Sequence, residues 1–364
     1  MFDVHVIGGG PAGCFAGIGA LSEGKSVLLS EEHRKIGEPE ACSGLISKSG
    51  LDSLAAHINY GEITLNTIAS AKIISGKQHF TISPKNETAL LVSRCGLDSL
   101  ASAKFEQEGG KLELGKKVTR NFSAKSIIGA DGPASAVAER FGFPKIKSYV
   151  ACMQGNFKYA CEDPHRTDIY LSAKDFPGFF GWAIPINEEE AKIGIGVSLP
   201  AHHPLKYYRR FLSKLGVASK PSHEFAAVIP TSVRKKTAMQ KSGYNVLLAG
   251  DAAGQVKATT GGGIFFGAQC GFLAGKNSGE PSSYEREWQG RFGLDLALHR
   301  HFRTLLDFAG GEPNPILLGA AKALFFEDLI SEKGKMDRWG DMLEPTLPIS
   351  YARIVARKMF GAST

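Results

Sequence analysis

The sequence lacks the cysteine pattern of a metal-binding or disulfide-linked protein. Its six cysteines contain no C-x-x-C pair, which argues against a zinc site, an iron–sulfur cluster and a disulfide framework. We therefore expect no metal, and reduced cysteines in an intracellular protein. The sequence also has no dense Lys/Arg tract with interleaved aromatic residues. We expect no nucleic-acid partner, although the net charge is +7.

Long apolar runs are scarce as well. The longest stretch without a charged residue spans 258–275, and it contains six glycines, which is typical of a loop and helix rather than a membrane span. The chain has a strand pattern from Phe2 onward, so we expect no signal peptide and no transmembrane segment. What remains is a globular chain of 364 residues with enough apolar material for a large core.

The order of apolar patterns predicts an α/β fold. Residues 2–31 have the pattern strand, glycine turn, helix, strand, and residues 245–249 return to the same buried-strand type. Between them the pattern favours a mixed sheet, and it becomes helical from Ser282. We predict a Rossmann-type dinucleotide-binding domain with an inserted mixed β-sheet substrate domain and a C-terminal helical segment. The dinucleotide-binding domain is expected to consist of residues 1–144 and 241–281. The substrate domain is expected at 145–240 and the helical segment at 282–364.

A G-x-G-x-x-G motif follows the first expected strand and precedes a helix. Gly8 permits a tight turn, Gly10 allows a pyrophosphate to approach the backbone, and Gly13 allows close packing of helix and strand. Glu31 lies 18 residues beyond Gly13, where a carboxylate can accept hydrogen bonds from ribose hydroxyls. The strand, helix and acid together favour a dinucleotide site over an ordinary glycine turn.

A second glycine motif favours FAD over NAD. Asp251 follows a strand and could bind a ribityl hydroxyl, a group that NAD lacks. Gly261, Gly262, Gly263 and Ile264 then begin a helix whose N-terminal amides could stabilise negative charge on a reduced flavin. The alternative is that this second motif is only a glycine-rich connector between strand and helix. Two separate glycine motifs in one chain favour the FAD site over that alternative.

These motifs, with Asp131 in the run Gly129-Ala130-Asp131-Gly132, resemble FAD-dependent enzymes of the p-hydroxybenzoate hydroxylase fold. Within that superfamily the chain resembles the geranylgeranyl reductases over residues 1 to about 275. The resemblance is carried by the stretches 35–47, 180–185 and 257–264. It implies reduction of isolated double bonds in polyprenyl chains, for example in archaeal digeranylgeranylglycerophospholipid.

The resemblance also implies site residues. Arg94 is chemically suited to bind pyrophosphate or ribose oxygens, although without the resemblance it would be a surface charge. Cys42 would lie beside the flavin as the candidate proton donor, with water at the 261–263 turn as the substitute, although such a cysteine is often a small buried filler. The positions that match the FAD contacts of the family are Ala12, Glu31, Cys42, Ser43, Gly44, Arg94, Val118, Asp251, Gly263 and Ile264.

Aromatic residues in the middle of the chain could form a channel for a polyprenyl chain. Core packing is the alternative explanation for most of them. The family has Tyr and Phe on either side of its Trp, where this chain has Phe180 and Ile184, so a role for a tyrosine hydroxyl is in doubt. The expected substrate-binding residues are Phe180, Trp182, Ile184 and Phe266.

A lipid substrate implies contact with a membrane. We expect a cytoplasmic protein bound peripherally to the inner face of the membrane through Lys206, Arg209 and Arg210 or through 353–358, unless these are solvated surface charges. The electron donor stays open among NAD(P)H, a reduced deazaflavin and ferredoxin. The alternatives are a flavin monooxygenase acting on an aromatic or lipophilic compound and an electron-transfer flavoprotein. The absence of clustered cysteines argues against the last.

Overall fold

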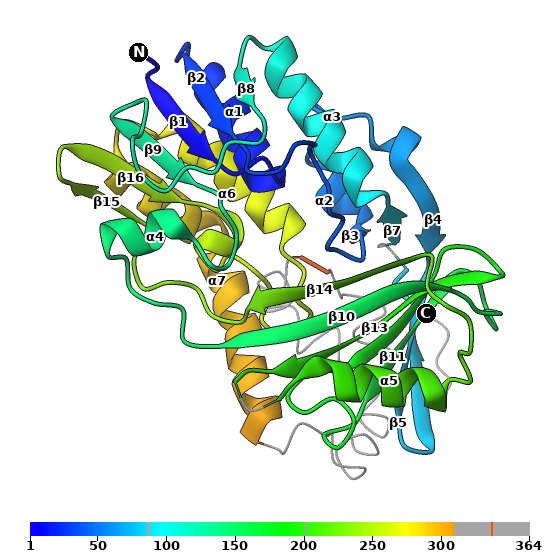
Figure 1. Ribbon diagram of the computed structural model, residues 1–364. Coiled ribbons are helices and arrows are strands. Elements are labelled where there is room, and N and C mark those ends of the chain that lie inside the picture. Colours follow the sequence, from blue (N-terminus) through cyan, green and yellow to red (C-terminus); the bar gives the residue numbers. More distant parts are fainter. Residues whose placement is uncertain (86–87, 201, 309–335, 338–364) are drawn as a thin grey trace, which may run out of the picture.

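A mostly parallel sheet whose central strands are buried along their length is the first sheet of the computed structural model (Figure 1). The structure describes residues 1–85, 88–200, 202–308, 336 and 337. All strands of this sheet run parallel except β15, which pairs antiparallel at one edge. The strand order is β15 (Ala238–Lys241), β16 (Tyr244–Leu248), β9 (Ser126–Gly129), β1 (Val4–Ile7), β2 (Val27–Ser30) and β8 (Lys111–Glu113).

Helices cover both faces of this sheet, which explains why its central strands are buried on both sides. One face packs on the short helix α4, with Val137 and Phe141 in the core. The opposite face holds the larger core. The helices are α1 (Pro11–Leu21), α3 (Arg94–Gln107), α6 (Ile264–Lys276) and α7 (Pro281–Phe308) on the larger core, and α4 (Ala136–Phe141) on the other face.

Helices α1 and α6 pack so closely that their backbones touch. A Cβ atom added at Gly271 would lie 2.1 Å from the Ala12 carbonyl oxygen, and one at Gly275 would lie 2.0 Å from that of Ala16. Only glycine fits at such positions. These contacts place the first half of α1 beside the second half of α6, although some 250 residues separate them in the sequence.

A mixed seven-stranded sheet forms the second layer (Figure 1). Helix α5 (Pro204–Lys214) covers one face and buries Tyr208 and Phe211 against it. The other face packs on a small sheet through Leu91. The seven-stranded order is β14 (His223–Pro230), β10 (Tyr149–Lys158), β13 (Glu190–Ser198), β12 (Gly181–Pro185), β11 (Arg166–Leu171), β5 (Ser70–Ser75) and β6 (Gln78–Ile82).

The small sheet connects the two layers. The helix α2 (Lys48–Asp52) follows its first strand, and the 3-10 turn η1 (Tyr60–Ile63) precedes its second strand in the chain. A second 3-10 turn, η2 (Gly250–Ala252), follows β16 of the first sheet. The strands of the small sheet are β3 (Leu45–Ser47), β7 (Ala89–Val92) and β4 (Thr64–Ile68), in that order.

The predicted fold class is confirmed: a Rossmann-type sheet, a mixed sheet and a helix after residue 281 are all present. The predicted domain boundaries stay a prediction, and sheet membership departs from them at one point. Strands β5 and β6 come from residues 70–82 but belong to the second sheet, where β5 pairs with β11 and β6 pairs with β5. Beyond α7, most of the predicted helical segment lies outside the described residues. Within the part described, none of the helices combines the length and apolarity needed to cross a bilayer.

Candidate functional site

The turn between β1 and α1 is built from backbone alone. Gly8 has a φ of +105°, and a Cβ added at Gly13 would lie 1.8 Å from the Gly8 carbonyl oxygen. Gly10 is the N-cap of α1 and makes no side-chain cap, so the positive end of the helix stays open to a ligand. The nearest atom to a Cβ added at Gly10 would be Nη2 of Arg94, at 3.7 Å. The turn and Arg94 therefore face the same space.

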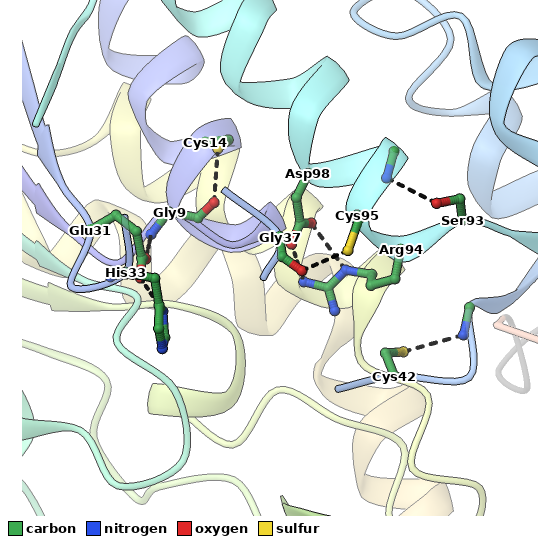
Figure 2. Close-up of polar contacts among 12 residues, drawn as sticks. Gly9, Cys14, Glu31, His33, Gly37, Cys42, Ser93, Arg94, Cys95 and Asp98 are labelled. Carbon is green, nitrogen blue, oxygen red and sulfur yellow. Dashed lines mark hydrogen bonds and ion pairs between the residues drawn. The ribbon is translucent and has the colours of Figure 1, made fainter. Parts of the chain in front are cut away.

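Glu31 follows β2 and lies against this turn (Figure 2). Its Oε2 accepts a hydrogen bond from the Gly9 backbone N–H at 2.7 Å, and its Oε1 accepts one from the His33 backbone N–H at 2.9 Å. The His33 ring contacts the same oxygen at 2.6 Å. A carboxylate can accept up to about four hydrogen bonds, so Glu31 keeps capacity for one further donor such as a ribose hydroxyl.

Arg94 begins α3 and is held by its own helix. Its Nε and Nη2 atoms donate to the two oxygens of Asp98 at 3.0 and 2.8 Å, a bidentate ion pair one helical turn long. Burial opposes the charge of Arg94, but Asp98 and the Cys42 thiol outweigh it and hold the Arg94 pKa above its usual range. Figure 2 shows Arg94 between Asp98 and Cys42. The guanidinium is therefore a fixed positive charge beside the thiol.

Two contacts from a buried lysine of the second sheet hold the segment that carries Cys42. Lys192 on β13 is 2% exposed, and its Nζ donates to the Ser43 carbonyl at 2.9 Å and to Oε1 of Glu40 at 3.1 Å. The Cys42 sulfur accepts a hydrogen bond from the Gly44 backbone N–H at 3.4 Å. Gly44 has a φ of +79°, and an added Cβ would lie 2.2 Å from the Val92 carbonyl oxygen. Only glycine fits there.

Asp251 lies where the two glycine motifs meet. A Cβ added at Gly263 would be 3.3 Å from Oδ1 of Asp251, and one at Gly250 would be 2.8 Å from Cβ of Ala12. Desolvation raises the pKa of Asp251 to about 6, with Arg94 opposing the shift. The structure thus brings Ala12, Asp251 and Gly263 together, as predicted sites of one cofactor would require.

The loop before α6 is closed on itself. The Gly261 N–H donates to the Lys257 carbonyl at 2.8 Å, and the Lys257 N–H donates to the Gly262 carbonyl at 3.1 Å. The Lys257 ammonium group, which is buried, pairs with Oδ1 of Asp337 at 2.6 Å. Ile264 then starts α6. Residue Asp337, far along the chain, therefore helps to fix the glycine loop.

Aromatic side chains form a wall on the face of the second sheet that points away from α5. Phe179 and Phe180 stack with ring centroids 4.2 Å apart, and Trp182 meets Phe180 edge to face at 5.8 Å. Ile184 belongs to the same apolar cluster. The Trp182 Nε1 donates to Oε1 of Gln154 at 2.9 Å. Three of the four residues predicted to bind substrate thus lie together.

Three predicted site residues have other surroundings. Phe266 is fully buried and packs edge to face with Phe265 and Phe292, so it belongs to the core between α6 and α7 rather than to the wall. Asp131 accepts hydrogen bonds from the Ser135 hydroxyl at 2.6 Å and the Val137 N–H at 3.0 Å, near the start of α4. Val118 lies in the apolar cluster that contains Ile7.

Sequence reasoning missed two buried polar residues of the site. Lys192 and Gln154 lie in β13 and β10, at positions where a buried strand would carry an apolar side chain. That anomaly is the only sequence signal for them, and it appears only once the strands are placed.

The residues fit FAD. A cradle of three successive glycines at Gly8–Gly10, a carboxylate at its edge and a second carboxylate beside the start of α6 match a dinucleotide with a ribityl chain. Among the described residues, no group of three or more His, Cys, Asp or Glu side chains could hold a metal ion.

Comparison with known proteins supports this reading of the site. A sequence-family model described as "FAD binding domain" matches residues 102–277. The chain is 29% identical to digeranylgeranylglycerophospholipid reductase 2 of Methanothermobacter thermautotrophicus, an alignment that covers 87% of this chain and 91% of the relative.

Two solved structures share the fold. A geranylgeranyl bacteriochlorophyll reductase-like protein of Thermoplasma acidophilum superposes with a TM-score of 0.77 at 22% identity and covers 98% of both chains. A probable FAD-dependent monooxygenase of Pseudomonas aeruginosa gives 0.68 at 15% identity, covering 88% of this chain and 99% of its own. The predicted resemblance and the FAD cofactor are confirmed, while the fold alone does not choose between reduction and oxygenation.

Proposed function

This chain is a homologue of the geranylgeranyl reductases with FAD as its cofactor, and from that premise we propose its reaction. We propose that it saturates isolated C=C bonds in polyprenyl chains of membrane lipid precursors. The names of its relatives support the substrate class. The observation that carries the proposal is the aromatic wall, formed by Phe179, Phe180, Trp182 and Ile184, on the sheet that also holds the Cys42 segment through Lys192.

The wall suits an apolar chain rather than a polar substrate. Trp182 and Ile184 are 8% and 4% exposed and pack inside the apolar cluster, so the partly exposed Phe180 is the ring of the wall that can contact a chain. Each CH₂ group that a prenyl chain buries contributes roughly 0.8 kcal/mol of binding free energy. The wall therefore binds and orients the chain.

An isolated alkene has no carbonyl that could accept charge, so protonation must lead or accompany hydride transfer. FAD, when bound and reduced, supplies the hydride. Cys42 holds the proton at its sulfur, and the neighbouring Arg94 compensates the negative charge left on sulfur after transfer. The apolar wall keeps competing water away. Water at the 261–263 turn is the substitute donor.

The test is incubation of the dithionite-reduced, FAD-loaded protein with digeranylgeranylglycerophospholipid, followed by mass spectrometry. We expect product masses that increase in steps of two hydrogens. An unchanged lipid in the presence of bound, reduced FAD would refute the proposal. Rapid NADPH oxidation with oxygen consumption on a lipophilic substrate would instead show a monooxygenase.

Contact with the inner face of the membrane is part of the proposal. Lys206 and Arg209 on α5 are exposed, whereas Arg210 pairs with Asp175 at 3.2 Å. The stretch 353–358 lies outside the described residues. Sedimentation with anionic liposomes at low salt tests the contact, and protein that stays in the supernatant refutes it. Comparison of NADPH, a reduced deazaflavin and reduced ferredoxin in the same assay identifies the electron donor.

A further inference from the structure

A small polar cleft lies at one end of the second sheet. At that end α7 passes the start of β10 and the ends of β13 and β14 (Figure 1). Its volume is about 100 Å³, roughly that of three water molecules at ~30 Å³ each, which is room for a compact group and not for a chain. It is lined by Ser148, Tyr149, Ser198, Leu199, Thr231, Arg300, Arg303 and Thr304.

The backbone pairing of the sheet holds the hydroxyls of this cleft in place. The Leu199 N–H donates to the Tyr149 carbonyl at 2.9 Å, and the Thr231 N–H donates to the Ser148 carbonyl at 3.0 Å. The Thr231 hydroxyl also donates to that of Ser148 at 2.8 Å. Three neighbouring strands thus bring their terminal hydroxyl groups to one place.

Two arginines of α7 complete the lining. Arg303 is 8% exposed, and its guanidinium donates to the Ser198 hydroxyl at 2.9 Å, to the Ala258 carbonyl at 3.2 Å and to the Gly178 carbonyl. Arg300 lies one turn earlier on the same helix face and is exposed. One guanidinium is therefore fixed, and the other can adjust to a ligand.

The chemistry of the lining selects an oxyanion. The described lining residues offer two guanidinium groups and several hydroxyls but no acidic side chain. Guanidinium groups and hydroxyls together match the several acceptor oxygens of a phosphate. We propose that this cleft binds the phosphate group of the lipid substrate. The assignment rests on the proposed function and adds to it the place of the polar head.

The position of the cleft relative to the aromatic wall supports a lipid phosphate. The Cζ atom of Arg303 lies 5.3 Å from the ring centroid of Phe179, the first ring of the wall. A Cβ added at Gly261 in the glycine loop would lie 3.5 Å from that same ring. A phosphate in the cleft would therefore sit at one end of the wall, with its prenyl chain extending along the rings past the glycine loop.

Binding to the FAD-loaded protein tests the assignment without turnover. The probes are geranylgeranyl phosphate, geranylgeraniol and inorganic phosphate, each titrated against the native protein, Arg300→Gln and Arg291→Gln. Arg291 is the matched control, because it is on the same helix but pairs with Glu287 in solvent. We expect Arg300→Gln to weaken binding of geranylgeranyl phosphate about tenfold, leaving geranylgeraniol unchanged, and Arg291→Gln to change neither.

Each other outcome has a definite meaning. Equal binding of geranylgeranyl phosphate by the native protein and Arg300→Gln would overturn the assignment. So would an equal loss for the phosphate and the alcohol. Inorganic phosphate that binds as tightly as geranylgeranyl phosphate would show a site for free anions and overturn the lipid assignment. Arg300-dependent binding of a lipid phosphate that the reduced protein never reduces would leave the cleft intact and refute the proposed function alone.

Discussion

The Nζ atom of Lys192 lies 2.9 Å from the backbone oxygen of Ser43, and this hydrogen bond joins the second sheet to the segment that carries Cys42. The same ammonium group pairs with Glu40 at 3.1 Å. A single buried side chain therefore fixes the position of the proposed proton donor relative to the aromatic wall.

Replacement of Lys192 should lower the rate of lipid reduction more than it lowers the affinity for FAD. Lys192→Met removes both contacts, and a displacement of the Cys42 segment by about 1 Å can cost on the order of 100-fold in kcat. The measurement is lipid reduction under single-turnover conditions beside flavin absorbance. Lys158→Met, at the exposed end of β10, is the control and should behave like the native protein. Native kcat in Lys192→Met would show that this contact positions nothing.

Cys42→Ala should lower the rate of double-bond reduction by about 100-fold or more, the usual contribution of a positioned general acid, because the proton then has to come from water. Cys42→Ser should retain part of the rate. Cys161→Ala is the matched control, since Cys161 packs on the α5 side of the sheet. Rapid-mixing spectroscopy of flavin reoxidation by substrate provides the rates. If Cys42→Ala has native rates and native FAD affinity, the sulfur is not the donor.

Two glycine replacements should differ in effect: Gly13→Ala should abolish FAD binding, whereas Gly290→Ala should stabilise the fold. Gly13→Ala places a methyl group 1.8 Å from the Gly8 carbonyl oxygen, so the turn must open and FAD should be lost. A Cβ at Gly290, in α7, meets no atom within 4 Å. Gly290→Ala should therefore raise the free energy of unfolding by about 0.5–1 kcal/mol. Flavin absorbance after gel filtration and denaturant unfolding measure the two effects. Retention of FAD by Gly13→Ala would contradict the geometry of the turn.

Asp251→Asn should stabilise the FAD-free protein and weaken its affinity for FAD. The pKa of Asp251 is raised from 3.8 to about 6, so the folded state binds a proton more readily than the unfolded state. The ionised carboxylate therefore destabilises the folded state above pH 6, and this cost shrinks as the pH falls toward 4. The gain in Tm should be full at pH 8 and small near pH 4.

The partly exposed Asp163→Asn serves as the control for this pH dependence. A gain in Tm for Asp251→Asn that does not depend on pH would show that the carboxylate is not the cause. FAD affinity should fall because the amide cannot replace both carboxylate oxygens as acceptors.

Local sequence patterns predicted the fold class and the glycine cradle well, because both depend on residues close together in the chain. Gly8, Gly13 and Glu31 lie within one strand-helix-strand unit, so their spacing fixes their geometry. The resemblance to a known family supplied Cys42 and Arg94, which no periodicity indicates.

Contacts between distant segments could not be predicted in the same way. Lys192 reaches Ser43 across some 150 residues, and Arg300 lines a cleft together with strand ends from three parts of the chain. Phe266 shows a further limit. An apolar residue in a glycine-rich helix can face a substrate or the core, and only the packing of α6 on α7 decides that it faces the core.

The hairpin of β5 and β6 has a consequence for dissecting this protein. Because it enters the second sheet from residues 70–82, a fragment of 145–240 would leave the long edge of β11 open to pair with other molecules. Expressed alone, such a fragment should aggregate. Exchanging the whole second sheet between homologues would require two separate exchanged segments, one for the hairpin of β5 and β6 and one for the remaining strands.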